Sequence, residues 1–97
     1  MIKFRYMKYA LALAEYGSFK RAALELHISQ PALSKGIAAL EEELGVAVFD
    51  RSSHPLQPTA SGRLVLEEAR RSLLGQRKLR EQLLKLHGGL QGSLRVA

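Results

Sequence analysis

Residues 30–35 carry the side chains of this chain that are best suited to recognising another molecule. Gln30, Ser34 and Lys35 supply an amide, a hydroxyl and an ammonium group, and the neighbouring Pro31 and Ala32 are compact. Glutamine can form two hydrogen bonds with adenine, and lysine can reach the acceptor atoms of guanine in the major groove of DNA. The same residue types also occur on ordinary solvated helix faces, so their place in the fold must decide between the two interpretations.

A pair of short helices joined by a tight turn would place these residues at the start of its second helix. Ser18 is an N-cap residue for a first helix that ends near residue 27, and Ser29 is an N-cap residue for the second. Pro31 falls in the first turn, where its missing N–H is tolerated. Four apolar residues then repeat at helical spacing and predict a buried stripe: Leu33, Ile37, Leu40 and Leu44. Residues outside this stripe at the helix start would face a major groove.

Gly36 lies inside the predicted second helix, where glycine costs about 1 kcal/mol of stability relative to alanine. A close approach of the backbone to another helix or to DNA would explain this glycine. Plain tolerance of the destabilisation would explain it equally well, so both interpretations stay open.

Further elements are expected on both sides of the helix pair. Residues 2–16 have an apolar face at helical spacing and are followed by Gly17, which predicts a first helix and its end. Residues 46–49 are short and apolar, and residues 56–59 could return as a second short strand after a turn cluster, which is typical of a hairpin. Pro58 confines the second stretch to an edge strand. Three helices followed by a small hairpin is the order of a winged helix-turn-helix.

The tip of the predicted hairpin is polar. Arg51, Ser53 and His54 are expected to project from it and to contact phosphates or a minor groove. Arg51 could instead form a surface ion pair with Asp50 or with a glutamate of the second helix, a contact worth about 0–1 kcal/mol. The glutamates at 41–43 are themselves expected to form a solvated cluster near the end of that helix.

Residues 60–86 predict a long fourth helix, with Thr59 or Ser61 as its N-cap residue. Its leucines exceed what a head of three helices can cover, which predicts packing against a second copy of the chain. The predicted dimerisation residues are Leu66, Ala69, Leu73, Leu79, Leu83 and Leu86. Their repeat is close to a heptad but shifts around residues 75–76. We therefore expect helix-on-helix packing rather than a long regular coiled coil.

Composition and charge bound the possible functions. The chain has 97 residues, of which 46% are hydrophobic, and no apolar run reaches the roughly 18–20 residues of a membrane span. With neither a signal segment nor a cysteine, we expect a cytoplasmic protein without membrane partners. The net charge of +6 favours an anionic partner. Residues 1–59 carry a net charge of +1 and residues 60–97 carry +5, so the head is nearly neutral.

No catalytic, cofactor-binding or metal site is predicted, so an enzyme is the class with the least support. The three histidines are scattered along the sequence, and it contains neither cysteine nor a Gly-rich phosphate loop. Two other classes stay open besides a sequence-specific DNA-binding protein. One is a DNA-coating protein without sequence preference, which the nearly neutral head disfavours because nonspecific affinity depends on phosphate neutralisation. The other is a pure interaction module whose last helix pairs with a partner.

The stretch SFKRAALELHISQPALSKGIAALEEELGVAVFDR resembles the N-terminal DNA-binding domain of LysR-type transcriptional regulators. The matching features are the serine that opens the second helix, an Ala-Ala pair, Leu-His-Ile-Ser-Gln-Pro-Ala-Leu-Ser, Leu-Glu-x-x-Leu-Gly and Phe-x-Arg. Thr59 and Gly62 match the start of the family's linker helix. The resemblance covers the chain from about residue 3 onward, and its Ser-Gln-Pro core is specific. His54 stands where arginine is common in the family.

This resemblance implies a mainly α fold divided into a winged helix-turn-helix domain at 1–59 and a linker and dimerisation helix at 60–88. A hinge at 89–97 would lead to an effector-binding domain that is mostly absent from this chain. No cofactor is expected here, whereas a small-molecule effector is expected for the missing domain. The chain would act as a homodimer, with a tetramer as an option for the full-length protein.

The function that the resemblance implies is binding of double-stranded DNA at a pseudo-palindromic site to regulate bacterial transcription. The predicted DNA contacts are Ser18, Lys20, Ser29, Gln30, Pro31, Ala32, Ser34, Lys35, Arg51, Ser53 and His54. The operator, the regulated genes, the effector and the choice between activation and repression do not follow from the sequence.

Overall fold

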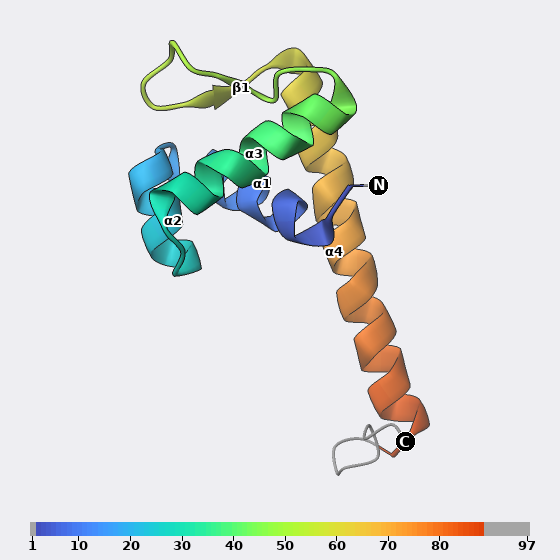
Figure 1. Ribbon diagram of the computed structural model, residues 1–97. Helices are drawn as coiled ribbons and strands as arrows, with labels where there is room; N and C mark the ends of the chain where they lie inside the picture. Colours follow the sequence, from blue (N-terminus) through green and yellow to red (C-terminus); the bar gives the residue numbers. More distant parts are fainter. Residues whose placement is uncertain (1, 89–97) are drawn as a thin grey trace.

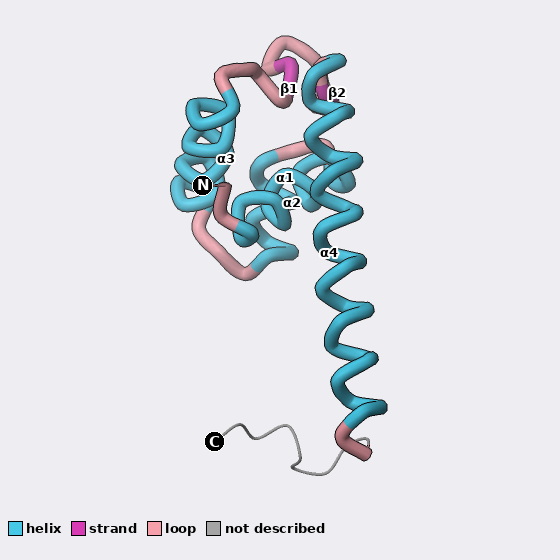
Figure 2. Tube along the Cα trace, turned by 90° about the vertical axis from the view of Figure 1, so that its right-hand side faces the viewer, coloured by secondary structure: helices cyan, strands magenta, loops and turns pink. Residues whose placement is uncertain are grey.

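The computed structural model describes residues 2–88 of the chain. Within this range the elements are, in order, α1 (Phe4–Tyr16), α2 (Phe19–Leu26), α3 (Gln30–Leu44), β1 (Phe49–Asp50), β2 (Gln57–Pro58) and α4 (Ala60–Leu86). Helices α1 to α3 form a head, the two strands form a hairpin beside it, and α4 passes along the head and continues beyond it (Figure 1, Figure 2). The predicted winged helix-turn-helix with a long fourth helix is therefore confirmed.

The predicted serine caps begin both helices of the central pair. The hydroxyl oxygen of Ser18 accepts a hydrogen bond from the backbone N–H of Arg21, and that of Ser29 accepts one from Ala32, each at 3.1 Å. His27 ends α2 with a φ of 59°, in the left-handed region that histidine enters more readily than most residues. Residues 27–29 separate the two helices, which confirms the predicted tight turn.

One face of α3 forms the centre of the core. Leu33, Ile37 and Leu40 are at most 1% exposed, whereas Leu44 at the end of the predicted stripe is partly exposed. The same cluster contains residues of α1, α2, the hairpin and α4: Leu13, Ala22, Phe49, Leu56 and Leu66. Burying a side chain of the size of leucine stabilises the fold by about 1.5–3 kcal/mol. The rotation of α3 about its own axis is therefore fixed by this stripe.

Gly36 lies where α3 packs against α1. A Cβ atom at this position would lie 2.6 Å from Cδ2 of Tyr9 and 3.1 Å from Cδ1 of Tyr6. The rings of these two tyrosines lie side by side on α1, with 5.8 Å between their centroids. Close packing of two helices explains this glycine, and neither DNA nor plain tolerance is needed.

Helix α4 begins against the base of the hairpin. The hydroxyl oxygen of Thr59 accepts a hydrogen bond from the N–H of Gly62 at 2.8 Å, so Thr59 rather than Ser61 is the N-cap residue. The same hydroxyl donates to the carbonyl of Ala47 at 2.6 Å, and the Thr59 N–H donates to the carbonyl of Val48 at 2.9 Å. Gly62 is buried under this loop, where a Cβ atom would overlap the carbonyl oxygen of Val48.

The strands are shorter than the sequence predicted. The first strand is confined to Phe49–Asp50 and the second to Gln57–Pro58, with Phe49 opposite Pro58 in an antiparallel pair. Val46 is 38% exposed, so the apolar stretch 46–49 does not run through a sheet. The reason is that the N–H of Val48 donates to a side-chain carboxylate rather than to a second strand. Helix α1 also begins at Phe4 rather than at residue 2.

The face of α4 that carries Leu66 and Ala69 is buried within the chain itself. These residues are 3% and 0% exposed, and Leu66 belongs to the core of the head. The head therefore covers more of α4 than the number of leucines suggested, and the role of Leu66 and Ala69 in dimerisation stays a prediction. The other predicted residues are Leu73, which is partly exposed, and Leu79, Leu83 and Leu86, which are 56%, 40% and 76% exposed.

Two predictions, the hinge and the division into domains, are not tested by the described residues. The hinge expected at 89–97 lies outside the described residues, and the division of the chain into domains stays a prediction. In the part of the chain that the structure describes, no helix is long and apolar enough to cross a membrane.

The contact at Gly62 predicts unequal effects for two glycine substitutions in α4. Gly62→Ala should lower the free energy of unfolding by about 1–3 kcal/mol, because the new methyl group meets backbone that cannot rotate away. Gly75→Ala is the control, since no atom lies within 4 Å of a Cβ atom at this position. It should raise stability by up to about 1 kcal/mol through helix propensity. Denaturant unfolding followed by circular dichroism measures the free energy of unfolding of both variants. Equal changes in the two variants would contradict the close contact at Gly62.

Candidate nucleic-acid interface

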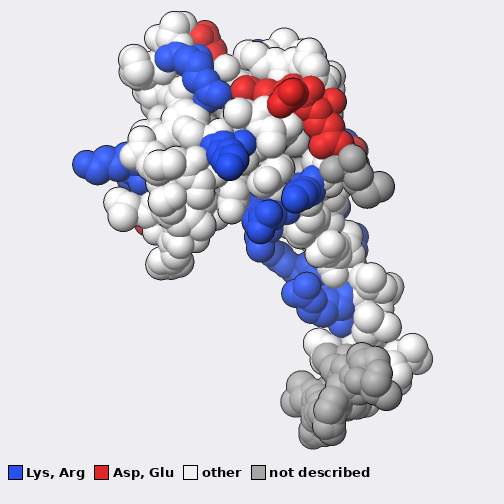
Figure 3. All heavy atoms as spheres, viewed as in Figure 1, with Lys and Arg blue, Asp and Glu red and all other residues white. Residues whose placement is uncertain are grey.

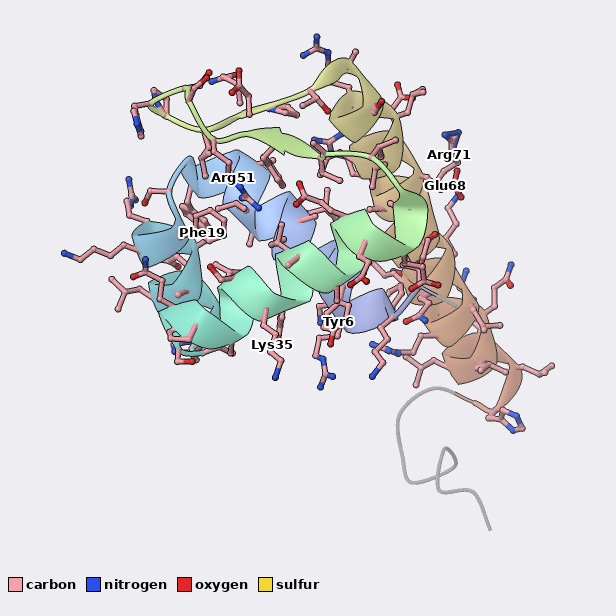
Figure 4. All side chains as sticks on the ribbon, turned by 45° about the horizontal axis from the view of Figure 1, so that its top comes forward. Tyr6, Phe19, Lys35, Arg51, Glu68 and Arg71 are labelled. Carbon is pink, nitrogen blue, oxygen red and sulfur yellow. The ribbon has the colours of Figure 1, made fainter. Side chains whose placement is uncertain are left out.

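The start of α3 presents its predicted recognition residues to solvent. Gln30, Pro31, Ala32, Ser34 and Lys35 are all exposed. The buried stripe holds the opposite face of α3 in the core, so these side chains cannot turn inward. Lys35 points away from the body of the head (Figure 4). An amide, a hydroxyl and an ammonium group therefore project from the first turns of one helix, as contact with base edges requires.

The two capping serines add hydrogen-bond donors at helix N-termini. Ser18 and Ser29 each use a hydroxyl lone pair for the cap, and each hydroxyl retains a proton that it can donate. Lys20 is exposed in the first turn of α2. Because a helix N-terminus carries a partial positive charge, such a position suits the oxygen of a phosphate group.

The hairpin loop occupies the predicted turn cluster and is held by side-chain hydrogen bonds that the sequence analysis did not predict. The carboxylate of Asp50 accepts hydrogen bonds from the N–H of Ser52 at 3.0 Å and from its hydroxyl at 2.6 Å. These bonds from Ser52 hold the pKa of Asp50 below its ordinary value, because they stabilise the charged form. The Asp-x-Ser spacing is the signal that could have revealed this turn. In the same loop, Arg51 and His54 are exposed and Ser53 is partly exposed.

Glu41 connects α3 to the base of this hairpin. Its carboxylate accepts hydrogen bonds from the backbone N–H groups of Val48 at 2.7 Å and Phe49 at 3.3 Å. Residues 41–43 were expected to form a solvated cluster, and for Glu41 this prediction is wrong. Sequence analysis missed this role because the three glutamates are identical in type, and helix phase alone selects the first of them.

Arg51 is held by the same carboxylate. Its Nη2 atom lies 3.1 Å from Oε1 of Glu41, and its Cζ atom lies 5.0 Å from the ring centroid of Phe19 on α2. Figure 4 shows the side chain reaching from the hairpin toward this ring. An ion pair between Arg51 and a glutamate of the second helix was one of the alternatives that the sequence left open. It is present, and the glutamate is Glu41 of α3. Because the Arg51 side chain is still 48% exposed, a contact with DNA stays a prediction.

Charge is distributed unevenly over the face that carries α3. Lysine and arginine side chains lie over the middle of the head and along α4, while acidic side chains gather near the end of α3 (Figure 3). Glu42 and Glu43 belong to that end of the helix. A polyanion would be attracted toward the start of α3 and repelled from its end, which is consistent with reading by the first turns of the helix.

The exposed apolar surface lies mainly on α4. Besides Leu79, Leu83 and Leu86, two leucines that the sequence analysis did not single out are exposed, Leu64 at 70% and Leu74 at 47%. Leu64 lines an apolar groove between α1, α3 and the first half of α4, together with Ile2, Met7, Leu40, Leu44, Val65 and Glu68. Exposed leucines therefore occur toward both ends of α4.

Comparison with known proteins identifies the family. The family model for the bacterial regulatory helix-turn-helix protein, lysR family, matches residues 4–63. The SDS degradation transcriptional activation protein of Pseudomonas sp. (strain ATCC 19151) is 48% identical over 92 residues, which are 95% of this chain and 30% of that protein. The regulator ClcR of Pseudomonas putida is 42% identical over 96 residues, 99% of this chain and 33% of ClcR. The chain thus spans about a third of the length of these relatives.

Solved structures agree with this assignment. A crystal structure of the BenM DNA-binding domain with catB site 1 DNA matches with a TM-score of 0.83 and 33% identity, covering 87% of this chain and 90% of that one. The structure of Vibrio fischeri DarR in complex with DNA matches with a TM-score of 0.83 and 30% identity, covering 89% of this chain and 30% of the DarR chain. The family model, the relatives and the fold coincide, and the chain belongs to the lysR family of bacterial regulatory helix-turn-helix proteins.

Proposed function

We propose that this chain binds double-stranded DNA in a sequence-specific manner and regulates transcription as the DNA-binding part of a LysR-type regulator. The observation that carries the proposal is the exposed start of α3, with Gln30, Ser34 and Lys35 projecting opposite a buried stripe. The BenM domain and DarR, which share this fold, were solved in complexes with DNA, and this supports the same role here.

In the proposed complex α3 lies in the major groove. Gln30, Ser34 and Lys35 contact base edges, and Pro31 and Ala32 make apolar contacts with a thymine methyl group or a sugar. Ser18, Lys20 and Ser29 contact phosphates at the starts of α2 and α3. The hairpin contributes Arg51, Ser53 and His54 along the backbone or the adjacent minor groove. Base contacts would supply specificity and the other contacts would set the position of the head on DNA.

We further propose that the chain forms a homodimer through α4, with the two helices antiparallel. Antiparallel pairing about a two-fold axis brings the end of one α4, with Leu83 and Leu86, against the start of the other. There Leu64 and its apolar groove would receive these leucines. Two heads related in this way would read the two halves of a pseudo-palindromic site.

The remaining expectations concern the whole protein and are proposals as well. A regulator of the length of the relatives would carry a further domain for a small-molecule effector, and it could assemble into a tetramer. It would act in the cytoplasm and without enzymatic activity of its own, since the relatives are described as transcriptional regulators. This chain would bind no cofactor.

Gln30→Ala tests sequence reading by α3. It should weaken binding to a duplex selected from a random pool by about 1–3 kcal/mol, because two hydrogen bonds to a base are lost. Binding to random duplex should change much less. The control is Gln82→Ala, which removes an exposed glutamine from α4 far along the chain from the head. Fluorescence anisotropy with both duplexes measures the four affinities. Equal losses for Gln30→Ala on selected and random DNA would make Gln30 a positioning contact.

Leu83→Asp tests the dimer. The substitution places a charge in the proposed interface, so it should weaken self-association while leaving the helical signal of the head intact. Leu24→Asp is the control, since Leu24 is 66% exposed on α2, away from α4. Sedimentation at tens of micromolar, roughly the range of a marginal interface, compares the variants with the parent chain. A monomeric parent chain at this concentration would contradict the proposed dimer.

His54→Ala tests the wing. If His54 lies along the DNA backbone, the substitution should weaken binding to selected and to random duplex about equally, because backbone contacts carry no sequence information. His27→Asn is the control, because asparagine tolerates the left-handed φ of 59° at this position. Fluorescence anisotropy measures the affinities of both variants. Unchanged affinity of His54→Ala for both duplexes would exclude the proposed wing contact.

A further inference from the structure

One carboxylate joins α3 to the hairpin through three hydrogen bonds. Glu41 on α3 accepts hydrogen bonds from the N–H groups of Val48 and Phe49, directly before and within β1, and from Nη2 of Arg51. Its side chain is 18% exposed, so the bonds from the two backbone N–H groups are partly shielded from solvent. Bonds to a single side chain of α3 thus help to set the position of the hairpin relative to that helix.

The guanidinium group of Arg51 is restrained on two sides. One edge faces Glu41 at 3.1 Å, and its carbon lies over the ring of Phe19, 5.0 Å from the centroid. A guanidinium group has five N–H donors, of which one is used by Glu41 here. The remaining donors and the 48% of the side chain that is exposed stay available to an acceptor outside the protein. A long side chain that would otherwise sample many rotamers is therefore held in one orientation before any ligand arrives.

We infer that Glu41 is a positioning residue for DNA binding, and that it acts through Arg51. The inference rests on the proposed DNA-binding function and extends it to a residue that need not touch DNA. Glu41 orients Arg51 so that its free N–H groups point outward from the base of the hairpin, where a phosphate oxygen can accept them. The loss of side-chain entropy on binding is then smaller than for a free arginine.

Charge gives this inference a distinctive consequence. A carboxylate near DNA repels phosphates, so removal of any glutamate from α3 should strengthen DNA binding slightly if charge alone matters. Glu42 is the neighbouring residue of the same type, and it is exposed on the same helix. Glu41 and Glu42 therefore differ in their contacts while their contribution to net charge is the same. Opposite effects of the same substitution at the two positions would separate positioning from charge.

The experiment compares Glu41→Gln with Glu42→Gln in DNA titrations at several salt concentrations. Glutamine at position 41 retains an oxygen that can accept from the Val48 N–H, so the hairpin should stay folded, and circular dichroism verifies this. Glu41→Gln should weaken binding about tenfold to a hundredfold, the effect of losing one charge-assisted hydrogen bond. Its salt dependence should be shallower by about one unit, since Arg51 no longer contacts a phosphate. Glu42→Gln should leave affinity equal or higher and the salt dependence unchanged.

The same substitutions in an Arg51→Ala background complete the test. If Glu41 acts through Arg51, Glu41→Gln should cause no further loss of affinity there. An undiminished loss in that background, or equal effects of the two glutamate substitutions in the parent chain, would overturn the inference. The parent chain provides a separate readout for the proposed function. If the parent chain fails to distinguish selected from random duplex, the proposal of sequence-specific DNA binding fails. If the parent chain binds the selected duplex specifically and Glu41→Gln binds it equally well, only the role of Glu41 is removed.

Discussion

The burial of one stripe of α3 is the constraint on which the rest of the head depends. Leu33, Ile37 and Leu40 are almost fully enclosed, and Gly36 brings the helix against the tyrosines of α1. A rotation of α3 would expose the stripe and force these rings apart, so the helix has one stable orientation. The polar face at its start is therefore presented by the core rather than by any contact of its own. Recognition residues of this kind can vary without loss of the fold, because they contribute little to the core.

The backbone of Val48 connects α3 to the hairpin and to α4. The Val48 N–H donates to Glu41 of α3, and the Val48 carbonyl accepts from the N–H of Thr59 at the start of α4. Two strands of two residues each would be too short to hold a hairpin in place by their own pairing. The contacts of the Val48 backbone supply further restraints, and Phe49 and Leu56 anchor the hairpin in the core. The hairpin therefore depends on contacts with the helices for its position and is not an independent sheet.

Contacts between neighbours in the sequence were predictable, and contacts that depend on the packing of distant elements were not. Ser18 and Ser29 cap helices that start at once after them, so their roles follow from residue type and spacing. For α4 the same signals allowed Thr59 or Ser61, and the structure selects Thr59. Glu41 could not be told from Glu42, because its partners lie across a loop whose path the sequence does not reveal. Leu66 and Leu79 looked alike for a similar reason. The length of α4 that the head covers depends on how the helices pack, so that one leucine is buried and the other is 56% exposed.

The continuity of α4 has a mechanical consequence. The helix runs without a break from its cap at Thr59 to Leu86, and its first half is fixed to the head by Leu66 and Ala69. Helices of 27 residues are about 40 Å long, at 1.5 Å per residue. Such a helix acts as a lever arm: a tilt of roughly 10° at its far end displaces the head by about 7 Å over this length. That displacement is comparable to the rise of two base pairs, so a small change at the far end of α4 would alter which spacing of half-sites two paired heads can span.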